Sequence, residues 1–150
     1  MPDRRRALAL LSAVLAAPAI RARAETPVEV WKTPSCGCCA AWVDRMREAG
    51  FAVAARDVTQ GALVGLKTRL GVTPETASRH TALIEGYVVE GHVPPGDVRR
   101  LLAERPDAAG LAVPGMPIGS PGMEMGDRVE PYATLLIGRD GRVSVFATHS

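Results

Sequence analysis

The chain has 150 residues, a formal net charge of +2 and three cysteines. Residues 1–24 contain five of the 18 Lys and Arg residues and one of the 16 acidic ones. Residues 25–150 therefore carry 13 basic and 15 acidic side chains, a net charge of −2. Because residues 25–150 are not basic overall, their net charge gives no reason to expect nucleic-acid binding. A length of 126 residues suits one domain with one hydrophobic core.

Residues 1–24 have the three parts of an export signal. Three arginines at 4–6 form a positive head, and the run ALALLSAVLAAPAI is apolar but too short to span a bilayer. The A-R-A at 22–24 is a small-x-small cleavage pattern. We therefore predict a signal peptide over 1–24, exported by the Sec or twin-arginine route, and a periplasmic domain over 25–150. The alternative interpretation is an amphipathic or buried N-terminal helix.

Hydrophobic periodicity after the leader alternates between strand and helix patterns. In chain order it predicts a strand at 28–33, a helix at 39–49, a strand at 51–58, a helix at 62–70, a hairpin at 81–93, a helix at 97–105 and a hairpin at 132–148. A βαβ start followed by a hairpin and a covering helix predicts a two-layer α/β sandwich with the thioredoxin-like order β-α-β-α-β-β-α. No second long apolar run exists, so no membrane contact is expected after leader cleavage.

Residues 106–131 are rich in glycine and proline and have no periodicity. We predict a long loop here, and loops of this length in compact domains are usually functional or disordered. The chain returns to the sheet afterwards, because the following hairpin has a clear Asp140-Gly141 turn.

All three cysteines lie in the stretch TPSCGCC, between the first predicted strand and the first helix. Cys36 and Cys39 have C-x-x-C redox spacing. A helix N-terminus lowers the pKa of a thiol, and the resulting thiolate can exchange disulfides or bind soft metals. Cys38 is superfluous for disulfide exchange, but it is an added ligand for a soft cation. The alternative is a structural Cys36–Cys39 disulfide with Cys38 buried as a small hydrophobic residue.

Three methionines, Met116, Met123 and Met125, lie within ten residues of the long loop. A thioether is a weak neutral ligand that prefers Cu(I) and other soft ions. Methionine more often fills cores, and Met46 is predicted to do so on the apolar face of the first helix.

Histidines are the remaining candidate ligands. His80 precedes the third strand and is expected to face the cysteine turn, whereas His92 follows the fourth strand and is expected farther away. His149 is predicted to lie in a disordered C-terminus. A Cys3His set would also suit zinc, but methionine adds nothing for zinc, so copper is favoured.

Four segments together resemble the periplasmic copper-resistance proteins of the CopG type, many of which are known only as a metal-binding family of unknown function. These segments are TPSCGCC, HTALIEGYVVEGHVP, LLAERPDAAGLAVPGMPIGSPGME and YATLLIGRDGRVSVFA. The resemblance covers nearly all of residues 27–148. It implies a thioredoxin-like fold and one or more copper ions, with Cys36, Cys38, Cys39, His80, Met116 and Met123 as metal ligands.

One position departs from the family pattern. Many members have cysteine before the histidine, in A-S-C-H-T-A, whereas this chain has Arg79 in the stretch ASRHTA. A permanent cation cannot ligate copper, so the departure implies fewer ions, weaker binding or a shift toward thiol chemistry.

The leading hypothesis is an exported copper-binding protein that handles Cu(I)/Cu(II) in copper resistance or homeostasis. Its expected partners are copper ions and other periplasmic copper-handling proteins, and neither nucleic acid nor membrane. The rival hypothesis is a thiol-disulfide oxidoreductase with Cys36 as the exposed nucleophile and Cys39 as the resolving thiol. A third is a zinc-stabilised interaction module.

Overall fold

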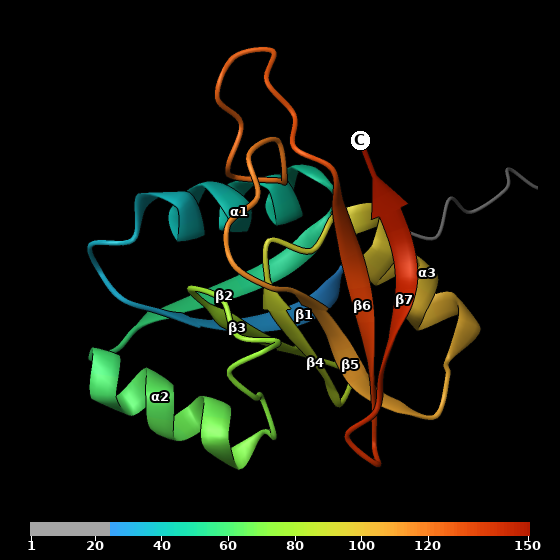
Figure 1. The fold of residues 1–150 in the computed structure, drawn as a ribbon. Helices are drawn as coiled ribbons and strands as arrows, with labels where there is room; N and C mark the ends of the chain where they lie inside the picture. The colour runs from blue at the N-terminus through green and yellow to red at the C-terminus, as the bar shows by residue number, and fades with distance from the viewer. Residues whose placement is uncertain (1–24) are drawn as a thin grey trace, which may run out of the picture.

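A computed structural model describes residues 25–150, so the expected signal peptide over 1–24 lies outside the described residues. The described chain forms a seven-stranded sheet with three helices (Figure 1), and the predicted α/β class is confirmed. The elements are β1 (Thr26–Lys32), α1 (Gly37–Glu48), β2 (Phe51–Asp57), α2 (Gln60–Arg69), β3 (Thr81–Ile84), β4 (Tyr87–Gly91), α3 (Pro95–Glu104), β5 (Ala108–Val113), β6 (Tyr132–Gly138) and β7 (Val143–His149).

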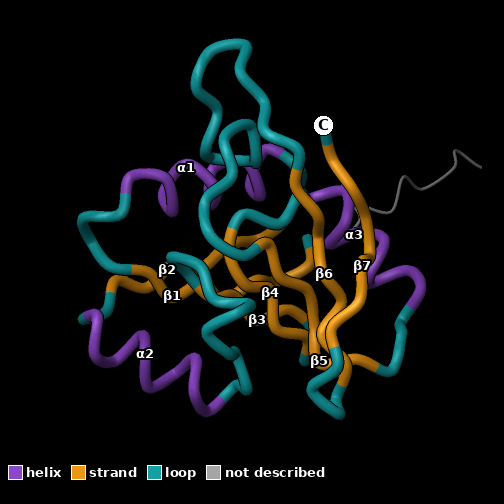
Figure 2. The backbone as a smooth tube through the Cα atoms, viewed as in Figure 1, coloured by secondary structure: helices purple, strands orange, loops and turns teal. Residues whose placement is uncertain are grey.

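The sheet is mixed, with the strand order β2-β1-β3-β4-β5-β6-β7 (Figure 2). β1 pairs with β2 in parallel, and β3 runs antiparallel to both β1 and β4. β5 pairs in parallel with β4, and β6 and β7 complete the sheet as an antiparallel hairpin. The sequence predicts this last hairpin correctly.

Strand β5 corrects the prediction of an uninterrupted loop over 106–131. Its sequence, AAGLAV, is rich in alanine and glycine, which have low strand propensity. The small residues are required by close packing, because a Cβ on Gly110 would lie 1.8 Å from the Val88 carbonyl oxygen. The true loop is therefore 114–131.

Helices cover both faces of the sheet. Side chains of α1 and α3 pack with Val28, Val30 and Val89 in one core cluster. α2 lies against the opposite face, where its Lys67 meets Glu90 of β4. α2 thus forms a third layer that the expected two-layer sandwich lacks, as Figure 1 shows.

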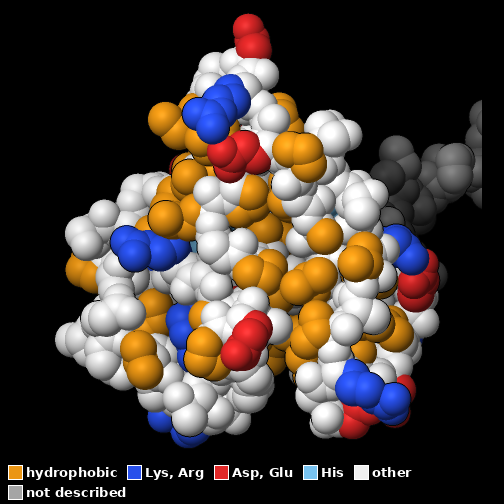
Figure 3. Space-filling model, viewed as in Figure 1, with side chains coloured by type: hydrophobic (Ala, Val, Ile, Leu, Met, Phe, Trp, Pro, Cys, Tyr) orange, Lys and Arg blue, Asp and Glu red, His pale blue; other side chains and the backbone are white. Residues whose placement is uncertain are grey.

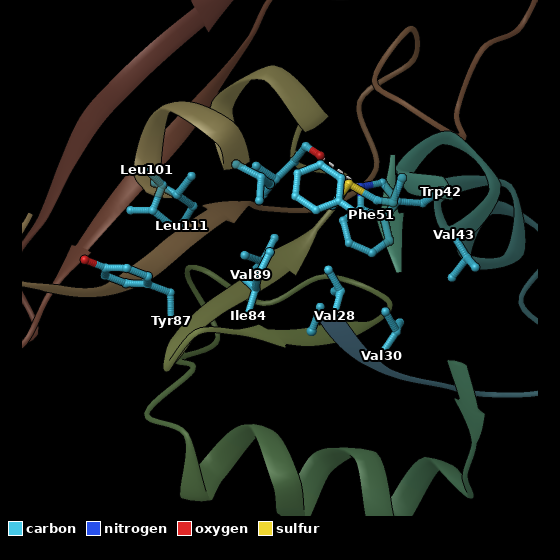
Figure 4. Packing of buried hydrophobic residues seen from close by; sticks show 14 of the residues in the cluster. Val28, Val30, Trp42, Val43, Phe51, Ile84, Tyr87, Val89, Leu101 and Leu111 are labelled. Atoms are coloured by element: carbon cyan, nitrogen blue, oxygen red, sulfur yellow. Dashed lines mark hydrogen bonds between the residues drawn. The ribbon is translucent and has the colours of Figure 1, made fainter. Parts of the chain in front are cut away.

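Helix α1 buries the face that its sequence pattern predicts. Cys39, Trp42, Val43 and Met46 are all buried, at the expected i, i+3, i+4, i+7 spacing. Met46 is 1% exposed, which confirms its assignment to the core. The Trp42 Nε1–H donates to the Val93 carbonyl oxygen at 2.9 Å, the hydrogen bond drawn in Figure 4.

Loop 114–131 protrudes beyond α1 (Figure 1), and its exposed hydrophobic side chains include those of Met116, Met125 and Val129. In the space-filling view, hydrophobic side chains gather over this loop and over the neighbouring sheet (Figure 3). Within residues 25–150, no helix has the length and apolar character needed to cross a membrane.

Candidate metal centre

The cysteine turn lies at the N-terminus of α1, as the sequence predicts. Cys36 occupies the N-cap position, and its carbonyl oxygen accepts a hydrogen bond from the Ala40 N–H at 3.2 Å. No side chain caps this end of the helix. The cysteine turn therefore lies at the positive end of the helix dipole, which favours negatively charged groups.

Cys36 and Cys39 form a disulfide, and Cys38 is the free thiol. The Sγ atoms of Cys36 and Cys38 are 3.5 Å apart, and all three sulfurs lie within 4.8 Å of one another. The pairing is the one that the structural-disulfide alternative requires, but Cys38 is half-buried rather than fully buried. Three thiolate ligands become available only when the Cys36–Cys39 bond is reduced.

Loop 114–131 brings one methionine to the cysteines. The Sδ atom of Met116 lies 4.0 Å from the Sγ atom of Cys38, and the Met116 side chain is 42% exposed. Met123 is half-buried, and its backbone pairs with Ser120 and Gly119. Met125 is 62% exposed. Met116 is thus the methionine in direct contact with a cysteine.

Gly122 holds the loop against α1. It has a positive φ of 87°, and a Cβ at this position would lie 2.7 Å from both the Cys38 carbonyl oxygen and the Trp42 nitrogen. The next turn of the loop is fixed by Arg45, whose Nε–H donates to the Glu124 carboxylate at 2.9 Å. The PGME stretch therefore sets how closely the methionine-bearing loop approaches the cysteine turn.

His80 lies against α1, beside Trp42, and the expectation that it faces the cysteine turn stays a prediction. The His80 side chain is fully buried, and its ring centroid is 4.5 Å from that of Trp42. His80 and His92 form an edge-to-face pair with centroids 5.1 Å apart. His92 therefore lies directly beside His80, and the expectation that His92 is farther than His80 from the cysteine turn stays a prediction.

Gly91 explains the position of His92. In a regular strand the side chains of consecutive residues point to opposite faces of the sheet. Gly91 ends this regular pattern directly before His92, because it adopts a φ of 74° and turns the chain. The Val93 N–H donates to the Gly91 carbonyl oxygen at 2.8 Å and completes the turn. The signal in the sequence is the glycine at the end of the strand, directly before the histidine.

Three ring nitrogens of this histidine pair are buried without a hydrogen-bond partner among the described residues. They are both nitrogens of His80 and the Nε2 of His92; the Nδ1 of His92 is 2.9 Å from the Pro121 carbonyl oxygen. Buried polar atoms are almost always paired, so orphaned nitrogens are the kind of atom that a metal ion would satisfy.

Both histidines are held in the neutral form that can ligate metals. Burial lowers the pKa of His80 well below its ordinary value of 6.5, and the neighbouring His92 and Lys67 act in the same direction. Burial also lowers the pKa of His92, against the opposing effect of its bond to Pro121.

The metal-free protein is expected to lose stability as the pH falls below about 6.5. The unfolded chain binds protons at these histidines near that pH, while the folded chain does so only at lower pH, so acid favours unfolding. The expected slope is up to about 1.4 kcal/mol per pH unit for each histidine. Urea midpoints between pH 7.5 and 5 would measure it. His80→Phe is expected to flatten the slope; equal slopes in both proteins would contradict the assignment.

Two further polar candidates from the sequence are Arg79 and His149. Arg79 is exposed. His149 is ordered in β7, contrary to expectation, because its Nε2 is 2.9 Å from an Asp97 carboxylate oxygen and its ring stacks on Tyr132. Its contacts are with this pair and with Thr134.

The donor set fits a soft cation. In residues 25–150, the cysteines are the only group of three or more Cys, His, Asp or Glu side chains close enough to hold a metal ion. A thioether and a neutral histidine pair lie next to that turn or to its helix. Thiolates and thioethers are soft ligands that select Cu(I), whereas a thioether contributes little to zinc.

The fold and this site define a small α/β domain with a cysteine-based candidate metal centre at a strand–helix turn. Residues 76–123 match the family described as "Protein of unknown function, DUF411". No curated protein matches the chain.

Two solved structures are similar over most of the chain. One is titled copper resistance protein CopG, form 2; it is 42% identical, covers 84% of this chain and 99% of its own, and has a TM-score of 0.78. The other, form 1, is also 42% identical, covers 83% of this chain and 98% of its own, and has the same TM-score. The chain therefore belongs to the CopG family of copper resistance proteins.

Proposed function

We propose that this chain is an exported periplasmic protein that binds copper and handles Cu(I)/Cu(II) in copper resistance or homeostasis. The observation that carries the proposal is the group of three cysteine sulfurs within 4.8 Å at a helix N-terminus, with the Met116 sulfur 4.0 Å from Cys38. The similar solved structures are named for copper resistance, which agrees with this chemistry.

In this proposal, the thiolates of Cys36, Cys38 and Cys39 hold one or more copper ions. Met116 and His80 complete the ligand set. Met123 of loop 114–131 and His92, which follows β4, are further donors. Soft sulfur ligands lower the free energy of Cu(I) more than that of Cu(II). Reduction of the Cys36–Cys39 disulfide takes up two electrons and two protons from an external donor and yields two thiols, and this reversible couple supports a redox role for the site.

We also infer a thioredoxin-like arrangement for β1 to α3. Three observations support it: the order β2-β1-β3-β4 among the first four strands, the antiparallel direction of β3, and helices on both faces of the sheet. The cysteine turn then lies where such an α/β fold presents functional groups, after a strand and before a helix.

Anaerobic titration of the reduced protein with Cu(I), in competition with a chromogenic chelator, tests the function. At least one tightly bound Cu(I) per chain is expected, and the Cys36→Ser/Cys38→Ser/Cys39→Ser variant is expected to lose it. Met116→Leu is expected to weaken binding about tenfold, and Met125→Leu, which changes an exposed methionine of the same loop, to leave it unchanged. No tight binding, or unchanged binding in the triple variant, would overturn the proposal.

A second candidate function is thiol-disulfide exchange, which the Cys36–Cys39 disulfide favours. The burial does not suit Cys36 as the exposed nucleophile, because Cys36 is 5% exposed and Cys39 is fully buried, while Cys38 is half-exposed. A disulfide-reductase assay on the metal-free protein separates the two functions. Robust turnover would favour the enzyme. Metal analysis of the protein as isolated, before the metal is removed, would distinguish copper from zinc.

A further inference from the structure

A fully buried carboxylate lies on the sheet face opposite α1. Glu90 is 0% exposed, and its Oε1 accepts hydrogen bonds from the Ser78 backbone N–H at 2.7 Å and from the Lys67 ammonium. Its Oε2 accepts from the Thr81 hydroxyl at 2.6 Å. Burial of this ion pair costs free energy, because both charges leave water, and well-packed apolar residues often stabilise a fold as well as a buried ion pair does.

The segment that Glu90 holds is also the segment that leads to His80. The carboxylate fixes its start through the Ser78 N–H, and the Gly91 N–H fixes its end by donating to the His80 carbonyl oxygen at 3.0 Å. Space is tight here, since a Cβ on Gly91 would lie 2.4 Å from the Ser78 Cβ. The direction of the His80 side chain therefore depends on the anchored Ser78.

The same segment holds the start of loop 114–131. The Ser78 hydroxyl donates to the Gly115 carbonyl oxygen, and the Gly115 N–H donates to the Ala77 carbonyl oxygen at 3.2 Å. Gly115 directly precedes Met116, whose sulfur contacts Cys38. Hydrogen bonds thus link the buried carboxylate to Ser78 and Ser78 to Gly115, and the backbone leads from these residues to His80 and to Met116.

We propose that Glu90, paired with Lys67, is a positioning group for the copper ligands: through Ser78 it fixes His80 on one side and Met116 on the other. This inference rests on the proposed copper site. Glu90 touches neither the metal nor the sulfurs. It acts by ordering residues 77–80 and 115–116 before the ion binds. The conformational entropy of these residues is then lost on folding and does not weaken the binding of copper.

Two double variants separate this role from a merely structural one. Glu90→Leu/Lys67→Met removes both charges together and leaves no acceptor for the Ser78 N–H. Glu90→Gln/Lys67→Met also removes both charges, but it keeps a side-chain carbonyl oxygen at the same place. The first is expected to bind Cu(I) about tenfold more weakly, the cost of ordering about one residue, and the second to bind within about twofold of the native protein.

Hydrogen exchange of the metal-free protein gives a readout independent of copper. The amides of Ser78 and Gly115 are expected to exchange faster in the Leu variant and at the native rate in the Gln variant. Ser78→Ala removes only the hydroxyl bond to Gly115 and should speed exchange at Gly115 while the protein stays folded. Ser144→Ala, on exposed β7, is the matched control.

The outcomes are distinguishable. Native exchange rates at Ser78 and Gly115 in the Leu variant, or equal Cu(I) affinities in the Leu and Gln variants, would overturn the positioning role. If the Leu variant fails to fold, native exchange at Gly115 in Ser78→Ala would overturn the step from Ser78 to Met116 on which the positioning role depends. Absence of Cu(I) binding by the native protein would instead refute the proposed function, and the exchange rates would still report whether Glu90 orders the segment.

Discussion

Trp42→Ala is expected to lower the free energy of unfolding by about 3–5 kcal/mol, the usual cost of truncating a buried tryptophan. Trp42 is 0% exposed and packs in the core between α1 and the sheet. Its indole N–H satisfies the Val93 carbonyl oxygen, which the substitution would leave unpaired. Urea denaturation followed by far-ultraviolet circular dichroism measures the loss.

The second tryptophan supplies the control for this experiment. Trp31 is half-exposed in β1, so Trp31→Ala is expected to cost clearly less than Trp42→Ala. Trp42→Phe keeps an aromatic ring beside His80 and should cost an intermediate amount. A loss below about 1 kcal/mol in Trp42→Ala would contradict the packing described for α1.

Gly122→Ala is expected to weaken Cu(I) binding by about tenfold or more, equivalent to about 1.4 kcal/mol. The added methyl would lie 2.7 Å from two backbone atoms of α1, and helix backbone cannot yield as a flexible side chain can. The loop must therefore move away from α1, and Met116 and Met123 move with it. Competition with a chromogenic Cu(I) chelator measures the change.

Gly126→Ala is the matched control, because Gly126 also has a positive φ, of 62°, but nothing lies within 4 Å of its Cβ position. Both variants meet backbone strain of about 1–2 kcal/mol, so strain alone cannot separate them. Only Gly122→Ala should also speed alkylation of Cys38 in the metal-free protein. Equal Cu(I) affinities and equal alkylation rates in the two variants would show that loop contact with α1 is irrelevant to the site.

Much of the fold could be predicted because its signals are local. The i, i+3, i+4, i+7 spacing of Cys39, Trp42, Val43 and Met46 predicts a half-buried helix, and all four side chains are buried. The last hairpin follows from its Asp140-Gly141 turn. β5 was not predictable in this way, because its alanine and glycine residues have low strand propensity. They are required by the close approach of β4, a contact that the sequence does not show.

The sequence predicts the sulfur-bearing residues of the candidate site better than the residues that surround and position them. Three cysteines within four residues of a predicted strand–helix turn are visible in the sequence alone. The contact between Met116 and Cys38 agrees with the expectation that a loop methionine lies near the cysteines. His92 depends on the left-handed turn at Gly91, a tertiary feature. The sequence did not predict the buried pair of Lys67 and Glu90, because charged residues are normally assigned to the solvent-exposed surface. Only the folded structure shows that both side chains are buried.

The Cys36–Cys39 bond has a consequence for how much metal a molecule of this protein can carry. An aerated sample should titrate with one sulfhydryl per chain, and a phosphine-treated sample with three. Copper capacity under the proposed function would then follow the supply of electrons in the surrounding compartment as much as the supply of the metal.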